Sequence, residues 1–592
     1  MKITKKILGA VSAAALLSAV PAFAQDASDF GFGDATATDG EESSDGAEAY
    51  VEPKLEWSGE AGVNARAWID TNEGYKSAND VSTKTGTEAN GYLKLDLNYN
   101  GSSTDFNGKL KLDTATIKDN PEDVLEEVTV RSYLGNWQVE AGKMKNVWGK
   151  GDKLHVLDNF NANDYTDFVF PDYIDRRIAE PMFKVSYASP SSGDYLSNIK
   201  LEGVYTPMMT ADRFASDGVL VPYSMTNLTN TVTGIVKHNA AIDLSSSLGN
   251  QDYAGIVDGL QTMSSFSADN LYEDNIKTLK YGQAGARFTA TFSGIDFGAS
   301  YYYGHYKQPS ANLGNFVDSI SNAIQSEVAT VLADSTKLNA NDAPYLYALV
   351  TRHNQEIATT AAALIAAGQA TETTAQALAT KAIIAKYAQA EASTYVGTGN
   401  QKLELPSLNY DQVQVFGLEA AFVLWKFNTR WEFAYNLTED TAGDNPWIKN
   451  NSIGWVAGFD MDLPIHNLNI NVQESGSYVL KNDKIEDGAY KTYDVDYNSD
   501  GNYTNNQLVV NVSDKWLYEK LTTECTVIYG IECKEWCVQP KISYNIFDGL
   551  TFIARGAYIY SNNENGQFYN FTQQNDKNHN ISFAQLSVQY KF

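Results

Sequence analysis

The stretch ISFAQLSVQYKF, Ile581–Phe592, ends the chain on a regular alternation. Apolar side chains stand at 584, 586, 588, 590 and 592, and polar ones at 585, 587, 589 and 591, with Phe583 the exception on the polar parity. Period-two alternation predicts a β-strand with one apolar and one polar face. A soluble protein rarely makes such a strand its last element and closes it on Phe.

The other end of the chain has the pattern of a secretory signal. Lys2, Lys5 and Lys6 form a basic head, an apolar run follows over 7–20, and Ala-Phe-Ala stands at 22–24. The run is shorter than the roughly 18 residues that span a membrane. We therefore expect residues 1–24 to be a cleaved signal peptide.

Residues 25–54 form an acidic segment. Nine acids stand among Gly, Ser, Ala and Thr, which predicts a disordered leader. The chain has a formal net charge of -29, and removing the three lysines of the signal gives -29 - 3 = -32. A charge of this sign argues against nucleic acid and anionic lipid as partners.

From residue 55 onward the alternation recurs. We count 18 candidate strands: 55–69, 91–100, 104–116, 125–134, 137–145, 180–188, 197–206, 278–292, 295–306, 408–422, 425–437, 452–462, 467–480, 505–514, 520–530, 534–546, 550–560 and 581–592. The polar faces carry charges of both signs. Links after even-numbered strands are short and those after odd-numbered strands mostly long, which is typical of outer-membrane barrels and not of Greek-key sandwiches.

The turns support this register. Leu134 and Trp137 share the apolar parity around Gly-Asn, and Phe292 and Ile295 do so around Ser-Gly, as two-residue hairpins require. Less certain are the Cys-bearing hairpin after the fifteenth strand and an apolar turn at 423–424, without which the count is 16. The sequence predicts an all-β fold: a transmembrane, antiparallel, up-and-down β-barrel of 16–18 strands over 55–592.

The chain resembles bacterial outer-membrane β-barrel proteins of the porin type. The signal peptide and the alternating last strand with Tyr590 and Phe592 carry this resemblance. It implies residence in the lipid bilayer of the outer membrane. It also implies that the barrel-assembly machinery recognises the terminal aromatic residues.

The third long loop, 146–179, is the first candidate site. In porins this loop folds into the lumen and narrows it, so the resemblance implies a constriction here. Opposed charges across a constriction filter solutes by charge and dipole. The candidate residues are Asp152, Asp158, Asp164, Asp167, Asp172, Asp175, Arg176 and Arg177. A solvated surface loop remains the alternative.

The insertion 307–407 has helical periodicity. Apolar residues recur at helical spacing over 313–331, and Ala-rich helices are expected at about 343–367 and 370–393. Loop parity places them on the outer side as a cap, a plug or a contact surface.

The polar parity of the strands predicts the lining of the lumen. Its charged candidates are Arg66, Lys94, Asp96, Lys109, Lys111, Arg287, Glu419, Lys426, Arg430 and Glu432. A barrel of 16–18 strands leaves an aqueous lumen. The leading hypothesis is a channel for passive passage of small hydrophilic solutes or ions. The alternatives are a surface interaction or adhesion barrel that uses its long outer loops, and a transporter of apolar solutes.

No pattern supports catalysis, a cofactor or a metal. The six histidines have no zinc spacing, and no nucleophile accompanies them. Residues 496–501 resemble the start of a calcium loop, but Gln507 replaces the bidentate Glu and an Asx-rich hairpin loop is favoured. Cys525, Cys533 and Cys537 leave at least one thiol outside any intrachain disulfide.

Overall fold

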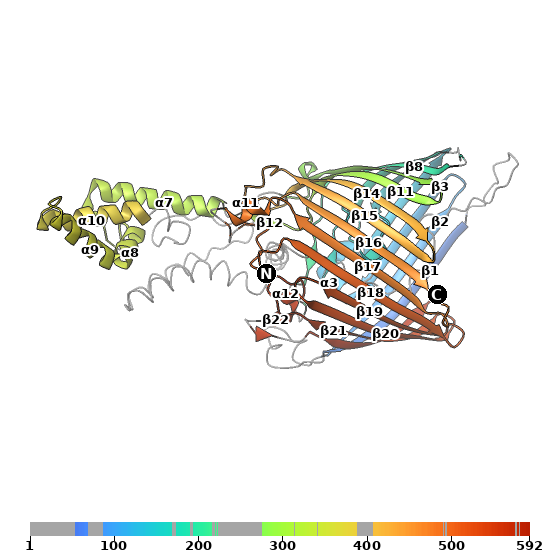
Figure 1. Ribbon diagram of the computed structural model, residues 1–592. Coiled ribbons are helices and arrows are strands. Elements are labelled where there is room, and N and C mark those ends of the chain that lie inside the picture. The colour runs from blue at the N-terminus through green and yellow to red at the C-terminus, as the bar shows by residue number, and fades with distance from the viewer. Residues whose placement is uncertain are drawn as a thin grey trace.

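The structure is a computed structural model that describes residues 54–68, 87–167, 173–189, 193, 195–215, 220, 222, 275–312, 314–339, 341–387, 407–488, 491, 494–574, 577–578 and 581–592. The predicted signal peptide and nearly all of the predicted acidic leader lie outside these residues. Figure 1 shows one β-barrel, with a group of helices extending from one rim.

The barrel contains 18 antiparallel strands. They are β1 (Lys54–Trp68), β2 (Thr87–Asn100), β3 (Thr104–Asp113), β4 (Leu125–Leu134), β5 (Trp137–Met144), β7 (Glu180–Ala188), β8 (Leu196–Thr206), β10 (Gln283–Phe292), β11 (Ile295–His305), β14 (Gln412–Leu424), β15 (Phe427–Thr438), β16 (Ser452–Asp462), β17 (Asn469–Val479), β18 (Thr504–Trp516), β19 (Leu521–Gly530), β20 (Glu535–Phe547), β21 (Leu550–Tyr560) and β24 (Phe583–Lys591). Every predicted strand is present, and the higher count of 18 is confirmed.

The sheet closes on itself. Each strand pairs with its neighbour in the chain, and the last strand, β24, pairs with β1 from Glu60↔Lys591 to Trp68↔Phe583. Closure removes both sheet edges, so the backbone groups of the first and last strands are paired. The structure therefore confirms the predicted up-and-down barrel.

The barrel is apolar outside and polar inside. On β24, Leu586 and Val588 are 53% and 46% exposed, whereas Gln585 and Ser587 are 2% and 5% exposed. The same inversion holds on β15, where Trp431 and Phe433 are exposed and Glu432 is buried. A protein that folds in water buries its apolar face, so this arrangement is that of a barrel whose exterior faces hydrocarbon.

The two rims differ as the sequence predicts. At the rim that holds the C-terminus, the links between strands contain two to seven residues. At the opposite rim the links are longer, with the Cys-bearing turn 531–534 as the exception. We call these the short-turn rim and the long-loop rim.

One turn lies two residues further along than predicted. Leu424 pairs with Phe427, so Trp425 and Lys426 form the turn between β14 and β15. Trp425 adopts a left-handed backbone with φ 60°. The prediction that Lys426 lines the lumen is therefore wrong, because this exposed residue is at a turn tip.

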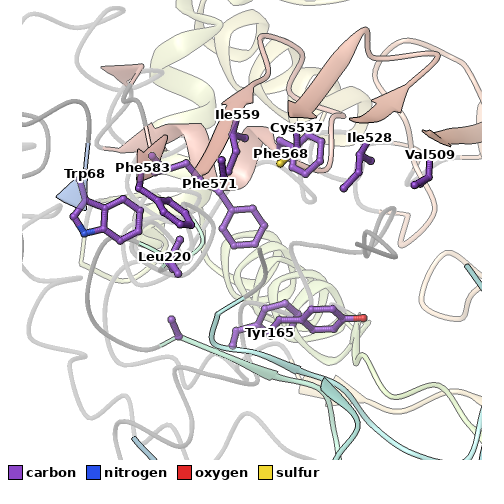
Figure 2. Packing of buried hydrophobic residues seen from close by; sticks show 14 of the residues in the cluster. Trp68, Tyr165, Leu220, Val509, Ile528, Cys537, Ile559, Phe568, Phe571 and Phe583 are labelled. Carbon is purple, nitrogen blue, oxygen red and sulfur yellow. The ribbon is translucent and has the colours of Figure 1, made fainter. Parts of the chain in front are cut away.

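Inside the long-loop half, apolar side chains of the wall pack against the loops (Figure 2). Trp68, Ile559 and Phe583 come from strands or strand ends, and Phe568 and Phe571 from the link between β21 and β24. The remaining buried members are Leu154, Tyr165, Phe214, Ala215, Leu220, Val456, Val509, Ile528, Cys537, Ala557 and Ile581. This interior cluster holds long loops against the wall.

The helices of the insertion are α7 (Gly314–Ala333), α8 (Pro344–Arg352), α9 (Asn354–Ala366) and α10 (Glu372–Tyr387). The helix expected over 343–367 is divided at His353. Figure 1 shows the group projecting away from the long-loop rim. The plug alternative is therefore wrong, because the described helices lie outside the lumen. No described helix is long and apolar enough to cross a bilayer.

Shorter elements lie in the links. They are α3 (Thr114–Asp119), η2 (Pro121–Asp123), β6 (Asp164–Tyr165), α4 (Tyr173–Arg176), β9 (Arg213–Phe214), η4 (Leu279–Tyr281), β12 (Ser310–Asn312), η5 (Ser335–Lys337), β13 (Ser407–Asn409), α11 (Asn482–Glu486), α12 (Tyr569–Thr572), β22 (Gln573–Gln574) and β23 (Lys577–Asn578). The pairing of β12 with β13 brings the two ends of the helical insertion together.

The insertion has its own core. Leu346, Leu349 and Ile357 are fully buried against α10, where Ala379 is also fully buried. We therefore expect that replacing residues 313–406 with Asn-Gly, which forms a tight turn between Asn312 and Ser407, leaves the barrel folded. Heat-modifiable mobility on gels should persist. Loss of that mobility in the deletion variant would show that the helices are integral to the barrel.

Candidate functional site

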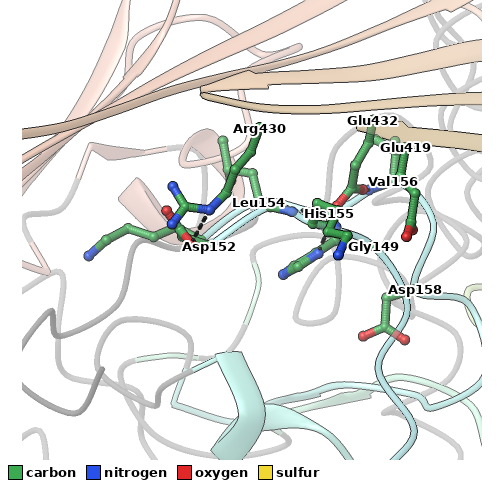
Figure 3. Close-up of polar contacts among 12 residues, drawn as sticks. Gly149, Asp152, Leu154, His155, Val156, Asp158, Glu419, Arg430 and Glu432 are labelled. Carbon is green, nitrogen blue, oxygen red and sulfur yellow. Dashed lines mark hydrogen bonds and ion pairs between the residues drawn. The ribbon is translucent and has the colours of Figure 1, made fainter. Parts of the chain in front are cut away.

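The link between β5 and β7 enters the barrel and contacts its wall at several places (Figure 3). We call residues 145–179 the inward loop, of which the structure describes 145–167 and 173–179. Asn161 holds its two ends together, because its amide donates to the carbonyls of Met144 (3.1 Å) and Ile178 (2.9 Å) and accepts from the backbone of Asn146 (2.8 Å). The loop therefore starts and finishes at one place on the wall.

An aromatic anchor fixes the first part of the loop. The indole of Trp148, 1% exposed, donates to Glu202 of β8 at 2.7 Å. Its ring meets Phe160 edge-on at 5.0 Å, and Phe160 meets Tyr302 of β11 at 5.1 Å. Aromatic rings in this geometry bury a large area and fix orientation. The loop is therefore tied to β8 and β11.

Glu432 of β15 is the main polar anchor. Its Oε1 accepts from the backbone of Lys150 and Gly151, both at 2.7 Å, and contacts His155 Nδ1 at 3.1 Å. Its Oε2 accepts from the backbone of Val156 at 2.9 Å. A buried carboxylate that accepts several N–H groups holds a loop strongly, because removing it leaves those donors unsatisfied.

Glycine makes this close approach possible. At Gly149, whose φ is +114°, an added Cβ would lie 2.2 Å from Glu432 Oε1. At Gly151, an added Cβ would lie 2.0 Å from the carbonyl oxygen of Leu154. Residues 148–152 therefore wrap around one carboxylate, and side chains larger than that of glycine do not fit at positions 149 and 151.

A second set of contacts extends the anchor to β16 and β17. Gln473 accepts from the backbone of Lys153 (3.0 Å) and Leu154 (3.1 Å). Asp152 pairs with Arg430 at 2.9 Å, and Arg430 also pairs with Asp460. One arginine therefore serves two carboxylates at this wall, one from the loop and one from β16.

The loop then contacts the opposite wall. Asp167 pairs with Arg66 of β1 at 2.6 Å, and Asp175 pairs with Lys94 of β2 at 3.1 Å. β2 is the second barrel strand and β15 the eleventh, so they are nine strands apart, which is half of the 18. The inward loop therefore bridges opposite walls of the barrel.

Between these attachments the loop is held by its own contacts. Arg177 pairs with Asp158 and donates to the carbonyl of Asn161 at 2.7 Å and the hydroxyl of Tyr173 at 2.6 Å. The ring of His155 stacks on Tyr173 at 4.4 Å. Burial raises the pKa of Asp158 above its ordinary value, and the ion pair with Arg177 offsets only part of that rise.

Two further loops join the same region. Arg213 pairs with Asp164 at 3.0 Å and with Asp123 at 2.8 Å. Asp212 accepts from the backbone of Asn163 at 2.7 Å and from the amide of Gln308 at 3.2 Å. The inward loop is thus linked to the base of the helical insertion.

The structure brings the predicted residues together, but in a different arrangement from the one expected. The sequence predicts opposed charges across a constriction, from the loop's aspartates and its two arginines. Among the described ion pairs of the loop, Asp158 with Arg177 joins two of these residues, and the two are in direct contact. Asp152, Asp167 and Asp175 instead pair with basic residues of the wall, where the polar parity of the strands places complementary charges. Asp164 pairs with Arg213 of the link between β8 and β10. Arg176 is buried, and Asp172 lies outside the described residues.

Most predicted lining residues face the interior, and most are paired. Arg287 contacts Glu419 at 2.5 Å, Lys109 contacts Glu127 at 2.8 Å, and Lys111 lies 3.6 Å from Asp113. Asp96 is half-buried, and its partners on the two neighbouring strands are Ser58 of β1 and Lys109 of β3. Apart from Lys426, the parity prediction therefore places these charges on the interior face.

Sequence reasoning missed several anchors of the inward loop. Glu202, Asp460, Asn471 and Gln473 stand on the polar parity of predicted strands, so parity assigns them to the interior. Asn471 is an anchor because its amide donates to Asp152 at 2.9 Å. Nothing in the sequence indicates which loop atom each one binds. Asp212 and Arg213, which stand beyond β8, carry no signal at all.

The other sequence motifs have structural roles. Asp496 accepts from the backbone of Asn450, and Asp500 accepts from Asn563, so their carboxylates serve different loops. The described residues contain no group of His, Cys, Asp or Glu able to hold a metal ion. Cys525, Cys533 and Cys537 are all free thiols.

Two half-buried aspartates in the outer link 480–503 predict a pH effect. Burial raises the pKa of Asp494 to about 7 and that of Asp496 to about 6, and neighbouring acids contribute. A folded-state pKa above the unfolded value gives stability that is complete at low pH and is lost as pH rises through the folded pKa. This link should therefore be better packed at pH 5 than at pH 8.

Limited proteolysis of the outer loops at the two pH values measures this effect. Cleavage within 480–503 should increase between pH 5 and pH 8, and the double variant Asp494→Asn, Asp496→Asn should lose most of that increase. Asp487→Asn, in the same link, is the matched control. Equal pH dependence in the double variant and the wild type would contradict the assignment.

Comparison with known proteins adds the following. No protein-family model matches the chain, and neither does any curated protein. Solved structures match over most of their length: the outer membrane channel DcaP of Acinetobacter baumannii (9% identity, 91% of this chain and 97% of that chain, TM-score 0.33), OpdO of Pseudomonas aeruginosa (8%, 91% and 97%, 0.38) and a BenF-like porin of Pseudomonas fluorescens (9%, 92% and 99%, 0.38). At these scores the matches carry no argument, and the 18-stranded barrel stands on its own strand pairing.

Proposed function

We propose that the protein is an outer-membrane channel for passive passage of small hydrophilic solutes, narrowed by the inward loop. The observation that carries this proposal is the bridge between opposite walls, from Arg430 and Glu432 on β15 to Lys94 on β2. A barrel of 18 strands is wide enough for an aqueous lumen. A loop attached to both walls narrows the path through the lumen.

The chemistry of the interior supports a hydrophilic solute. Charged and amide side chains line the inner face, whereas the exterior presents Leu, Val, Trp and Phe. Such an exterior suits the lipid bilayer of the outer membrane, and the terminal strand suits recognition by the barrel-assembly machinery. The apolar interior cluster is packed between wall and loops, so it supports anchoring of the loops more than transport of apolar solutes.

Planar-bilayer recording of the refolded protein tests the proposal. Insertion should produce discrete, ohmic steps of conductance. Refolded barrel that is heat-modifiable on gels yet never conducts would contradict the channel and leave a surface interaction barrel as the better reading.

Selectivity should respond to the charges that hold the inward loop. Asp167→Asn leaves the guanidinium of Arg66 without its nearest carboxylate partner, at 2.6 Å in the wild type. The reversal potential under a salt gradient should therefore shift toward anions, and the shift should shrink as salt rises. Asp105→Asn, at the short-turn end of β3, is the control. An unchanged reversal potential in Asp167→Asn would place this pair away from the ion path.

A further inference from the structure

The short-turn rim has two unlike halves. In the half from β14 to β21, three neighbouring hairpins, which join β14 to β15, β16 to β17 and β18 to β19, carry bulky apolar residues within their turns. These residues are Trp425 (88% exposed), Ile465 (65%), Leu517 (61%) and Tyr518 (102%). We call them the apolar tips.

The other half of the rim is built differently. Its described turn residues are Gly101, Ser102 and Ser103 after β2, Gly135 and Asn136 after β4, and Ser293 and Gly294 after β10. Tyr195, before β8, is the exception among them. Bulky apolar residues such as Leu134, Trp137 and Phe292 are exposed at strand ends in this half too. The two halves therefore differ in the turns themselves and not in the strand ends beside them.

Three of the apolar tips are held in an unfavourable backbone. Trp425 has φ 60°, Leu517 has φ 53° and Tyr518 has φ 56°. Gly and Asn adopt this left-handed region easily, whereas residues with large side chains do not. Turns of the polar half place Gly there, at Gly135 and Gly294. Bulky residues at such positions are disfavoured by local structure, which points to a role outside the turn.

We propose that the apolar tips insert into the headgroup and acyl boundary of the periplasmic leaflet, so that the barrel sits deeper on its β14–β21 side. Short turns of outer-membrane barrels face the periplasm. The tips continue the lipid-facing surface, because Leu424 and Trp516 next to them are exposed strand ends. Trp and Tyr prefer this boundary, and the adjacent Lys426 and Lys520 can extend toward phosphate.

The spacing of the tips favours lipid over a protein partner. Successive hairpins are two strands apart, so their tips are separated by about 10 Å along the rim. Polar residues such as Asn467 and Glu519 stand in the same turns. A fluid leaflet accommodates separate apolar side chains, whereas a protein interface usually needs a continuous apolar centre.

Spin labels at the rim test this proposal, which rests on the proposed membrane location. In a background with Cys525, Cys533 and Cys537 changed to Ser, single cysteines replace Lys426 and Lys520 beside the apolar tips, and Ser102 and Asn136 in the polar half. A fifth label at Leu586, 53% exposed on the lipid-facing side of β24, reports whether the barrel is in the bilayer at all. The protein is refolded into phosphatidylethanolamine–phosphatidylglycerol vesicles. Collision with oxygen, which partitions into lipid, is compared with collision with a water-soluble nickel chelate.

Labels at 426 and 520 should favour oxygen over nickel, and labels at 102 and 136 should favour nickel. Adding Trp425→Ser should shift the label at 426 toward nickel. If the label at 586 favours oxygen while 426 and 520 match 102 and 136, this inference is overturned and the membrane barrel stands. If the labels at 426 and 520 are shielded from nickel in native outer membranes but not in the vesicles, a protein covers the apolar tips. The lipid assignment is then also overturned. A label at 586 that favours nickel would instead contradict the proposed membrane location.

Discussion

Glu432→Ala should increase single-channel conductance and make the open current noisy. The substitution leaves the backbone N–H groups of Lys150, Gly151 and Val156 without their acceptor. Each stranded, buried donor costs about 1–3 kcal/mol. The loop should therefore leave the β15 wall, while its attachments at Arg66 and Lys94 persist.

Two variants make this result specific. Glu432→Gln retains one carbonyl acceptor and should give an intermediate conductance. Glu60→Ala removes an interior carboxylate that contacts Tyr92 and Lys591 but no described residue of the inward loop, and it should leave the current quiet. Conductance of Glu432→Ala equal to that of the wild type would show that the inward loop does not limit the current.

Removing Tyr590–Phe592 should nearly abolish assembly of the barrel. Phe592 exchanges two backbone hydrogen bonds with Gly59, both at 2.9 Å, and its ring lies edge-on to Trp57 at 5.8 Å. An added Cβ at Gly59 would lie 2.5 Å from the Phe592 ring, so this glycine makes room for it. The aromatic end therefore closes the seam between the first and last strands, where an unpaired edge would face lipid.

The single substitution Phe592→Ala should reduce assembly less than the truncation, because its backbone bonds remain. Phe547→Ala removes an exposed ring from the end of β20, away from the seam, and is the matched control. The measurement is the heat-modifiable fraction in outer membranes against total exported protein. Equal fractions for Phe592→Ala and Phe547→Ala would argue that the terminal ring has no special role.

The barrel was predictable because its signal is local. Alternation within each strand identifies the strands, and the parity match across Gly135 and Asn136 or Ser293 and Gly294 fixes their register. The exception is instructive. The β14–β15 turn is expected at 423–424, because Trp425 continues the apolar alternation of Phe427 and Trp431, yet Trp425 takes a left-handed φ of 60° in the turn itself.

The inward loop was predictable in outline but not in its contacts. Parity assigns Glu432 and Arg430 to the interior, and the glycines at 149 and 151 indicate a tight turn. The pairing of Asp152 with Arg430, 278 positions away in the numbering, depends on closure of the whole barrel. Likewise, the break between α8 and α9 at His353 depends on packing, since this ring stacks on Tyr387 of α10 at 4.0 Å.

Thiol modification at two adjacent residues of β2 tests the central claim most directly. Asp96 lies on the interior parity and Leu97, 42% exposed, on the exterior. In the background without native cysteines, each is changed to Cys, and a water-soluble, charged thiol reagent is added during planar-bilayer recording. The account predicts a lasting drop in conductance for Asp96→Cys and no change for Leu97→Cys. A drop for Leu97→Cys alone, or an unchanged current in Asp96→Cys after mass spectrometry shows that it has reacted, would contradict an aqueous channel through this barrel.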